Sequence, residues 1–273
     1  MKKKRIFVSF ISVLIILSIS CAPTPPTYSR QDIEKIIKEL CKKEFNIGVK
    51  VWEAGDTIWV YAPFENPLDE KGTWSNEKIS KDIERIYLSL SRVILSMDKR
   101  PKFYCFLVSD IRNGFDIYTI WFIRDLMMYH TEFISRGEFS ERRVAFIFTN
   151  PQAIDDKEGK HVHGYDISMG EFISYLIKQS IEIKFASDEV KDNFVINEVK
   201  TNYDNGRLKV QFDIMTKKYK KGFDSPLEEI EKIMKKFLKI YQFPPEIKEI
   251  VISDIFNKTS RFYTRQELIA KKK

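Results

Sequence analysis

The strongest constraint on the fold is an internal duplication of the sequence. The segment FLVSDIRNG at 106–114 resembles IVISDIFNK at 250–258, an offset of 144 positions (250 minus 106). Both segments contain Ser-Asp-Ile-x-Asn, and at the same offset Pro101 falls on Pro245. Shared polar residues and an aligned proline are not expected from two unrelated amphipathic stretches. The sequence therefore predicts two halves of similar structure.

An amphipathic helix precedes each of these segments. Apolar residues recur at spacings of three and four, which marks one face of a helix. These residues are Ile83, Ile86, Leu90, Val93, Ile94 and Met97 in the first half, and Leu227, Ile230, Met234, Phe237, Leu238 and Tyr241 in the second. Further upstream, each half has a helix (36–45 and 176–185) followed by a hairpin. The hairpin turns lie at 54–56 and 204–206, where Gly and Asn tolerate positive φ.

A second hairpin closes each half. Its strands are expected at 102–110 and 115–123 in the first half, and at 246–255 and 261–268 in the second. A helix at 124–136 and a strand at 143–149 connect the halves. We predict an α+β fold with two similar α-ββ-α-ββ lobes, 31–155 and 156–273, each a mainly antiparallel sheet covered by helices. The pattern leaves open whether the lobes share one sheet.

The N-terminal segment has the layout of a secretory signal peptide over residues 1–20. A basic stretch at 2–5 precedes the uncharged apolar run 6–19. A helix of that run would be about 21 Å long, which is short of the roughly 30 Å hydrocarbon core of a bilayer. A permanent transmembrane anchor is therefore not expected, and we exclude this segment from the fold.

Leu17-Ser18-Ile19-Ser20-Cys21 resembles the lipobox of bacterial lipoproteins, whose cysteine is lipidated and becomes the new N-terminus. It departs from that pattern in having Ser18 where a leucine is usual. The resemblance implies a covalent lipid such as palmitate on Cys21, with ordinary secretory cleavage after Ser20 as the alternative. Residues 21–30 then form a lipid-anchored tether, stiffened by three prolines.

The resemblance also predicts a location in the cell envelope. In a cell with two membranes, Ala22 after the cysteine resembles the default for sorting to the outer membrane, with the body facing the periplasm. In a cell with one membrane, the body would lie on the outer face of the cytoplasmic membrane. The lipid makes the membrane a partner, and an envelope protein is a further possible partner.

Most of the net positive charge belongs to the signal segment. The whole chain carries +7, and removal of residues 1–20 removes four basic residues and leaves +3 (42 minus 39). This does not favour nucleic-acid binding, which requires a concentrated basic face. In an oxidising compartment Cys41 and Cys105 could pair, but two cysteines are a weak disulfide pattern, and we favour burial of both as free thiols.

The segment 155–166 is the candidate metal site. His161 and His163 would point the same way on an extended segment, and Asp166 could add a carboxylate to a divalent metal. The alternative is a polar inter-lobe loop that ends at the helix N-cap Ser168, with Glu171 three residues on. Because no known zinc spacing fits, we favour the loop.

Two further features could form contacts. The basic residues Lys217, Lys218, Lys220 and Lys221 could touch anionic lipid headgroups or an acidic partner, or form a solvated loop. The Ser-Asp pairs at 109–110 and 253–254 could line a shared cleft, or satisfy the backbone of the turns that follow.

The chain has no G-x-S-x-G, H-E-x-x-H, G-x-x-x-x-G-K or G-x-G-x-x-G motif. No cofactor is therefore expected. The leading hypothesis is an exported, membrane-anchored lipoprotein that acts as a non-enzymatic binding or interaction module of the cell envelope. A membrane-tethered, metal-dependent hydrolase that uses the His161 and His163 region is the alternative, and a passive spacer is a third class.

Overall fold

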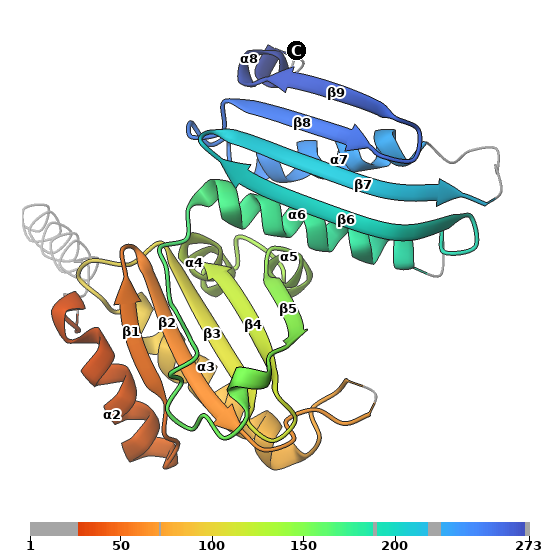
Figure 1. Ribbon diagram of the computed structural model, residues 1–273. Helices are drawn as coiled ribbons and strands as arrows, with labels where there is room; N and C mark the ends of the chain where they lie inside the picture. Colours follow the sequence, from red (N-terminus) through yellow and green to blue (C-terminus); the bar gives the residue numbers. More distant parts are fainter. Residues whose placement is uncertain (1–26, 71, 188–189, 218–224, 271–273) are drawn as a thin grey trace, which may run out of the picture.

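The computed structural model describes residues 27–70, 72–187, 190–217 and 225–270. It confirms a mixed α+β architecture of two similar lobes, each with its own sheet (Figure 1). No helix within these ranges is long and apolar enough to cross a membrane. The predicted residue Cys21 and the residues Lys218, Lys220 and Lys221 lie outside the described ranges.

The first lobe is built on a five-stranded sheet of order β1-β2-β3-β4-β5. Its elements are the 3-10 turn Arg30–Asp32, α2 (Ile33–Phe45), β1 (Lys50–Ala54), β2 (Thr57–Phe64), α3 (Glu77–Leu95), β3 (Phe103–Asp110), β4 (Phe115–Phe122), α4 (Ile123–His130), α5 (Arg136–Glu141) and β5 (Val144–Thr149). Only the β2–β3 pair is parallel, because α3 crosses over between these two strands.

The second lobe repeats this arrangement with four strands in the order β6-β7-β8-β9. Its elements are α6 (Met169–Ala186), β6 (Phe194–Asp204), β7 (Arg207–Thr216), α7 (Pro226–Ile240), β8 (Glu249–Asp254), β9 (Thr259–Thr264) and α8 (Arg265–Ala270). Again only the central pair, β7–β8, is parallel. The fifth strand of the first lobe has no counterpart here, since it belongs to the connecting segment.

Individual backbone hydrogen bonds recur between the lobes. Lys102 N–H bonds to Asp56 C=O as Lys248 N–H bonds to Gly206 C=O. At the other end of the same strands, Ile111 N–H bonds to Phe64 C=O, and Ile255 N–H bonds to Phe212 C=O in the same way. The duplicated sequence therefore folds into duplicated strand pairings, as predicted.

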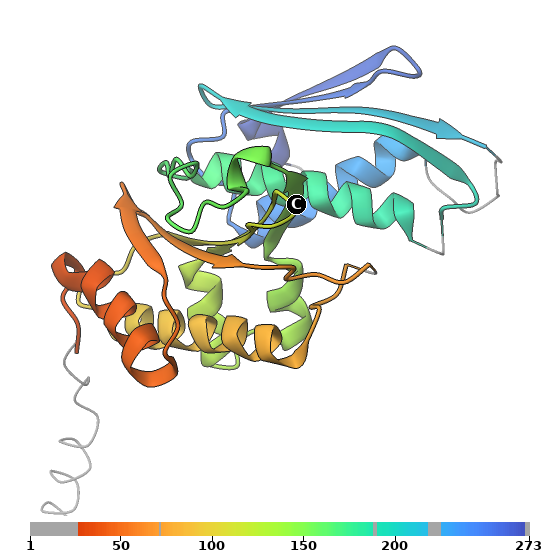
Figure 2. The same ribbon diagram turned by 60° about the horizontal axis from the view of Figure 1, so that its bottom comes forward.

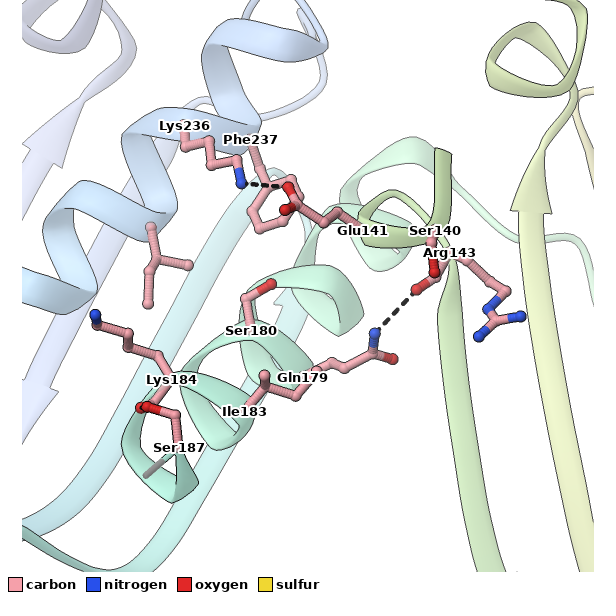
Figure 3. A pocket seen from close by; sticks show the side chains of 11 residues that line it. Ser140, Glu141, Arg143, Gln179, Ser180, Ile183, Lys184, Ser187, Lys236 and Phe237 are labelled. Atoms are coloured by element: carbon pink, nitrogen blue, oxygen red, sulfur yellow. Dashed lines mark hydrogen bonds and ion pairs between the residues drawn. The ribbon is translucent and has the colours of Figure 1, made fainter. Parts of the chain in front are cut away.

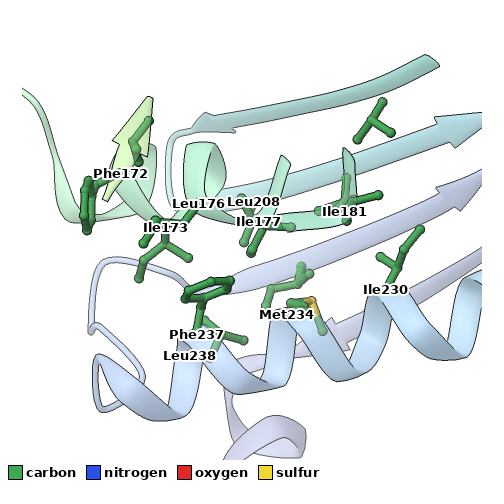
Figure 4. Close-up of a cluster of buried hydrophobic side chains, with 14 of the residues drawn as sticks. Phe172, Ile173, Leu176, Ile177, Ile181, Leu208, Ile230, Met234, Phe237 and Leu238 are labelled. Carbon is green, nitrogen blue, oxygen red and sulfur yellow. The ribbon is translucent and has the colours of Figure 1, made fainter. Parts of the chain in front are cut away.

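The layers stack as α2 and α3, first sheet, α6 and α7, second sheet (Figure 2). The helix α6 is buried on two sides. Its Phe172 ring lies 5.1 Å from Phe103 of the first sheet, while Ile173, Leu176, Ile177 and Ile181 join the core of the second lobe with Met234 and Phe237 of α7 (Figure 4). The two lobes therefore share one continuous hydrophobic cluster although their sheets are separate.

Along β7, the outer face of the second sheet is polar. On β7, Leu208, Val210, Phe212 and Ile214 point inward, while Arg207, Lys209, Gln211 and Asp213 alternate with them. This period-two pattern is typical of a strand with one solvated face. By contrast, β3 is buried at every residue, because helices cover both faces of the first sheet.

Two predicted elements of the chain were wrong in detail. The connecting helix expected at 124–136 is interrupted, because Glu132 has a φ of 60°, in the left-handed region that ends a helix. The last strand, expected to reach residue 268, ends at Thr264, and the short α8 begins at the next residue.

Cys41 and Cys105 are both buried and free, as favoured, and burial raises the pKa of each thiol.

Candidate binding site

A groove of about 510 Å³ lies where the end of α5 and Arg143 of the first lobe face α6 and α7 of the second (Figure 3). Ile183 of α6 is 62% exposed on its wall, an unusual fraction for isoleucine in a structured helix. Ile233 of α7 adds further apolar surface, whereas Phe237 of the same helix borders the groove but is 1% exposed. The groove thus offers an accessible apolar wall at the junction of the lobes.

The polar lining of the groove combines lysines with a glutamate and several neutral side chains. Lys184 of α6 and Lys236 of α7 border it, and Lys236 Nζ lies 2.7 Å from the carboxylate of Glu141 in α5. Both partners of this inter-lobe ion pair are more than half exposed, so it contributes little to stability. The side chain of Arg143 extends away from the groove (Figure 3).

A side-chain amide closes one end of the groove against β5. Gln179 Oε1 accepts a hydrogen bond from Ala145 N–H at 2.6 Å, and Gln179 Nε2 donates to Arg143 C=O at 3.0 Å. The amide thus takes the place of a neighbouring strand at the beginning of β5. Beyond it, β5 is an edge strand on which Ile147 is 61% exposed and Phe148 is 45% exposed.

The predicted metal ligands are not brought together. His161 is turned inward, with 3% of its side chain exposed, whereas His163 is exposed. The carboxylate of Asp166 accepts hydrogen bonds from Asp56 N–H at 2.8 Å and Thr57 Oγ1 at 3.2 Å, where it holds the β1–β2 turn. No group of three or more possible ligands occurs within the described ranges. The metal site stays a prediction without a supporting contact.

His161 instead joins a buried polar cluster on the first sheet. Its Nδ1 lies 2.6 Å from Asp156 Oδ2, and its Nε2 lies 3.3 Å from Asp116 Oδ2 in the geometry of an ion pair rather than an aligned hydrogen bond. Asp116 is fully buried and accepts hydrogen bonds from Ser109 Oγ and from Asn150 Nδ2. We call Ser109, Asp116, Asn150, Asp156 and His161 the His161 clasp.

The His161 clasp is placed to hold structure rather than to perform chemistry. Its members Ser109, Asp116 and His161 have side chains that are at most 3% exposed, so no substrate can reach them. Asp116 lies between the serine and the histidine, so the imidazole cannot take the hydroxyl proton directly. The clasp fastens the segment 155–166 onto the first sheet, where Tyr61 also donates a hydrogen bond to Asp156 C=O.

Opposing effects set the pKa of Asp156. Burial raises it, but hydrogen bonds from His161 and from Glu158 N–H favour the ionised carboxylate and outweigh burial. The pKa of Asp156 therefore lies below its ordinary value. The segment is fastened most firmly when this carboxylate is charged.

The aspartates of the duplicated Ser-Asp pairs accept hydrogen bonds from the turns that follow their strands. Asp110 accepts hydrogen bonds from Arg112 N–H and Asn113 N–H, and Asn113 Nδ2 donates to its second oxygen at 2.8 Å. Asp254 and Asn257 repeat this contact, also at 2.8 Å. The Asp-x-x-Asn spacing is thus a turn device used twice.

The chain enters the body on the side of α2 and α3. Thr27 N–H bonds to Ser96 C=O at 2.8 Å, and Tyr28 pairs with Met97 at the end of α3. Arg30 continues the attachment with ion pairs to Glu53 and Asp56. Lys217, the one described member of the predicted basic group, is exposed and bonds Asn193 C=O through its N–H.

Comparisons with protein families, with curated proteins and with solved structures find no match for this chain. The groove was not predicted from the sequence. Its walls come from segments far apart in the chain, as the pair Lys236 and Glu141 illustrates. The one available signal was Ile183, an isoleucine between Glu182 and Lys184 that lies off the buried face of its helix.

Proposed function

We infer that this protein is an exported, lipid-anchored binding module of the cell envelope that holds a partner in the groove between its lobes. The observation that carries the inference is the exposed apolar wall of Ile183 beside the amines of Lys184 and Lys236. An accessible apolar surface with a few convergent polar groups is the usual form of a binding site. The partner that fits it presents an apolar side chain next to an acidic group.

The N-terminal segment supports the anchored state. Five residues, 22–26, separate the lipobox cysteine from Thr27, the first residue fixed to the body. Fully extended, the six steps from Cys21 to Thr27 span about 20 Å. A lipid on Cys21 would therefore hold the body close to the membrane, with the side of α2 and α3 nearest to it and the groove further away.

Two independent measurements test this function. For the anchor, incorporation of labelled palmitate and recovery in the membrane fraction are compared between the wild-type chain and Cys21→Ser. Lipid incorporation that depends on Cys21 is expected, and equal behaviour of both chains would remove the anchor from the proposal. For the groove, the partner recovered in detergent is compared between the wild type and Ile183→Asp, which places a carboxylate on the apolar wall.

A further inference from the structure

The outer edge of β5 is an unprotected pairing edge. Asn150 N–H bonds to Gly114 C=O on the β4 side, and Ala145 N–H points to Gln179 on the opposite side. Because main-chain groups alternate in direction along a strand, Ile147 and Thr149 also face outward. Five outward groups are left after Gln179 has bonded: Ala145 C=O, Ile147 N–H, Ile147 C=O, Thr149 N–H and Thr149 C=O.

The other outer strands carry the features that discourage pairing. β1 has Lys50 and Glu53, β9 has Arg261, and β6 has several charges and a bulge between Ile196 and Glu198. Charges and bulges of this kind keep sheet edges from joining. β5, Val-Ala-Phe-Ile-Phe-Thr, has no charge, no proline and no bulge.

We propose that β5 pairs with β5 of a second copy of this chain, antiparallel about a two-fold axis at Ile147, and joins the two five-stranded sheets into one. In this register Ile147 N–H and C=O bond with those of Ile147 in the other copy. Thr149 N–H of each copy bonds Ala145 C=O of the other. These four hydrogen bonds use every outward group that Gln179 leaves open except Thr149 C=O, which faces Ala145 N–H of the other copy.

Gln179 bonds the part of the edge where this pairing ends. Pairing about Ile147 sets Ala145 opposite Thr149, the last residue of β5. Thr149 C=O of the second copy then faces Ala145 N–H, to which the Gln179 amide is bonded. Pairing to the end of β5 therefore displaces Gln179 from Ala145 N–H, and Arg143 C=O lies beyond the last residue of the partner strand.

The side chains and charges at the edge are also complementary to a second copy. No charged residue lies between Val144 and Asn150, so the central pairs bring no like charges together. Pairing places Ile147 against Ile147 on one face and Phe146 against Phe148 on the other. Aromatic and β-branched neighbours of this kind stabilise cross-strand pairs by roughly 0.2–1 kcal/mol each.

The side on which Thr27 enters each body is consistent with such a dimer. Two antiparallel strands are related by a two-fold axis normal to their sheet. Both α2–α3 layers then lie on the same side, where Thr27 enters each body. This part of the argument rests on the proposed anchor, since two lipids in one membrane require that arrangement. The strand pairing does not depend on it.

Disulfide cross-linking tests the dimer in the full chain. Ile147→Cys is made in a Cys21→Ser background, in which the two remaining cysteines, Cys41 and Cys105, are buried. Lys200→Cys on the β6 edge is the matched control, because it is also exposed on an outer strand. Mild oxidation is expected to link Ile147→Cys into dimers, and to leave the control monomeric. Equal cross-linking of the two variants overturns the proposal.

Sedimentation equilibrium of the same Cys21→Ser chain, without added cysteines, gives a second test. We expect self-association, and Ile147→Lys should raise its dissociation constant at least about tenfold, because two like charges would face each other at the axis. Ile147 is mostly exposed, so the variant is expected to fold. A monomer in the wild-type background, at every concentration reached, contradicts the proposal. Neither test uses the lipid or the groove, so failure here leaves the proposed function untouched.

Discussion

The hydroxyl of Tyr241, at the end of α7, donates a hydrogen bond to the carboxylate of Asp125 in α4, 2.7 Å away. This contact crosses from the second lobe to the first. Arg142 binds the other oxygen of the same buried carboxylate at 3.0 Å. Burial raises the pKa of Asp125 by more than these two partners lower it. The two lobes are therefore held together by this polar contact as well as by the shared apolar cluster.

Tyr241→Phe should lower the free energy of unfolding by about 1–3 kcal/mol, because the substitution removes a donor to a buried carboxylate and keeps the ring. Urea denaturation measures the change. Tyr129→Phe is the control, since no hydrogen bond of the Tyr129 hydroxyl is found within the described ranges. Equal stability of the two variants would mean that the Asp125 contact does not hold the lobes together.

His161→Ala should release the segment 155–166 from the first sheet. Removal of the imidazole leaves the carboxylates of Asp116 and Asp156 without the side chain that lies between them, and a buried polar group left without its partner costs about 1–3 kcal/mol. Trypsin cleavage after Lys157 and Lys160 reports the release. His163→Ala serves as the control because His163 is exposed. Similar cleavage rates in both variants would contradict the role of the His161 clasp.

Stability should fall in acid through Asp156. A carboxyl whose folded-state pKa is depressed contributes stability above its unfolded pKa, about 3.9, and that contribution is lost as the pH falls through the folded pKa. Thermal unfolding between pH 7 and pH 2 is expected to show a loss below about pH 4. The loss should be smaller in Asp156→Asn. An unchanged profile in that variant would assign the acid sensitivity to other carboxylates.

The inter-lobe pair of Lys236 and Glu141 should affect binding more than stability. Lys236→Glu reverses one of the two amines in the groove and should weaken capture of an acidic partner. Because the pair is exposed, unfolding should change by less than about 1 kcal/mol. The double variant Lys236→Glu with Glu141→Lys restores the ion pair between the lobes but keeps the altered charge on α7. We expect it to restore stability and not to restore binding. Full recovery of binding in the double variant would place the partner elsewhere.

The duplication predicted the fold well because the residues that reveal it lie close together in the sequence. Asp110 and Asn113 form a turn within four residues, and the stripe from Ile83 to Met97 repeats along one helix face. The strand order and the parallel central pair then follow from the crossover helix. The two errors, at Glu132 and after Thr264, both concern where an element ends. Element ends depend on backbone conformation at a single residue.

The candidate site could not be predicted in the same way. Gln179 and Arg143 meet only because α6 packs across the first sheet, and no local pattern records that contact. The spacing of His161 and His163 predicted that both would point one way, which requires an extended strand. The segment instead curls around Asp156, and only His161 turns inward. Long-range packing decides such positions.

The most direct test of the account is a pull-down of the intact protein from its native envelope in detergent, made in parallel with Ile183→Asp. The bound material is identified by mass spectrometry. We expect a defined partner that is recovered with the wild type and lost with Ile183→Asp, while both proteins stay in the membrane fraction. Recovery of the same material with both proteins, or of none with either, would contradict a binding site in the groove.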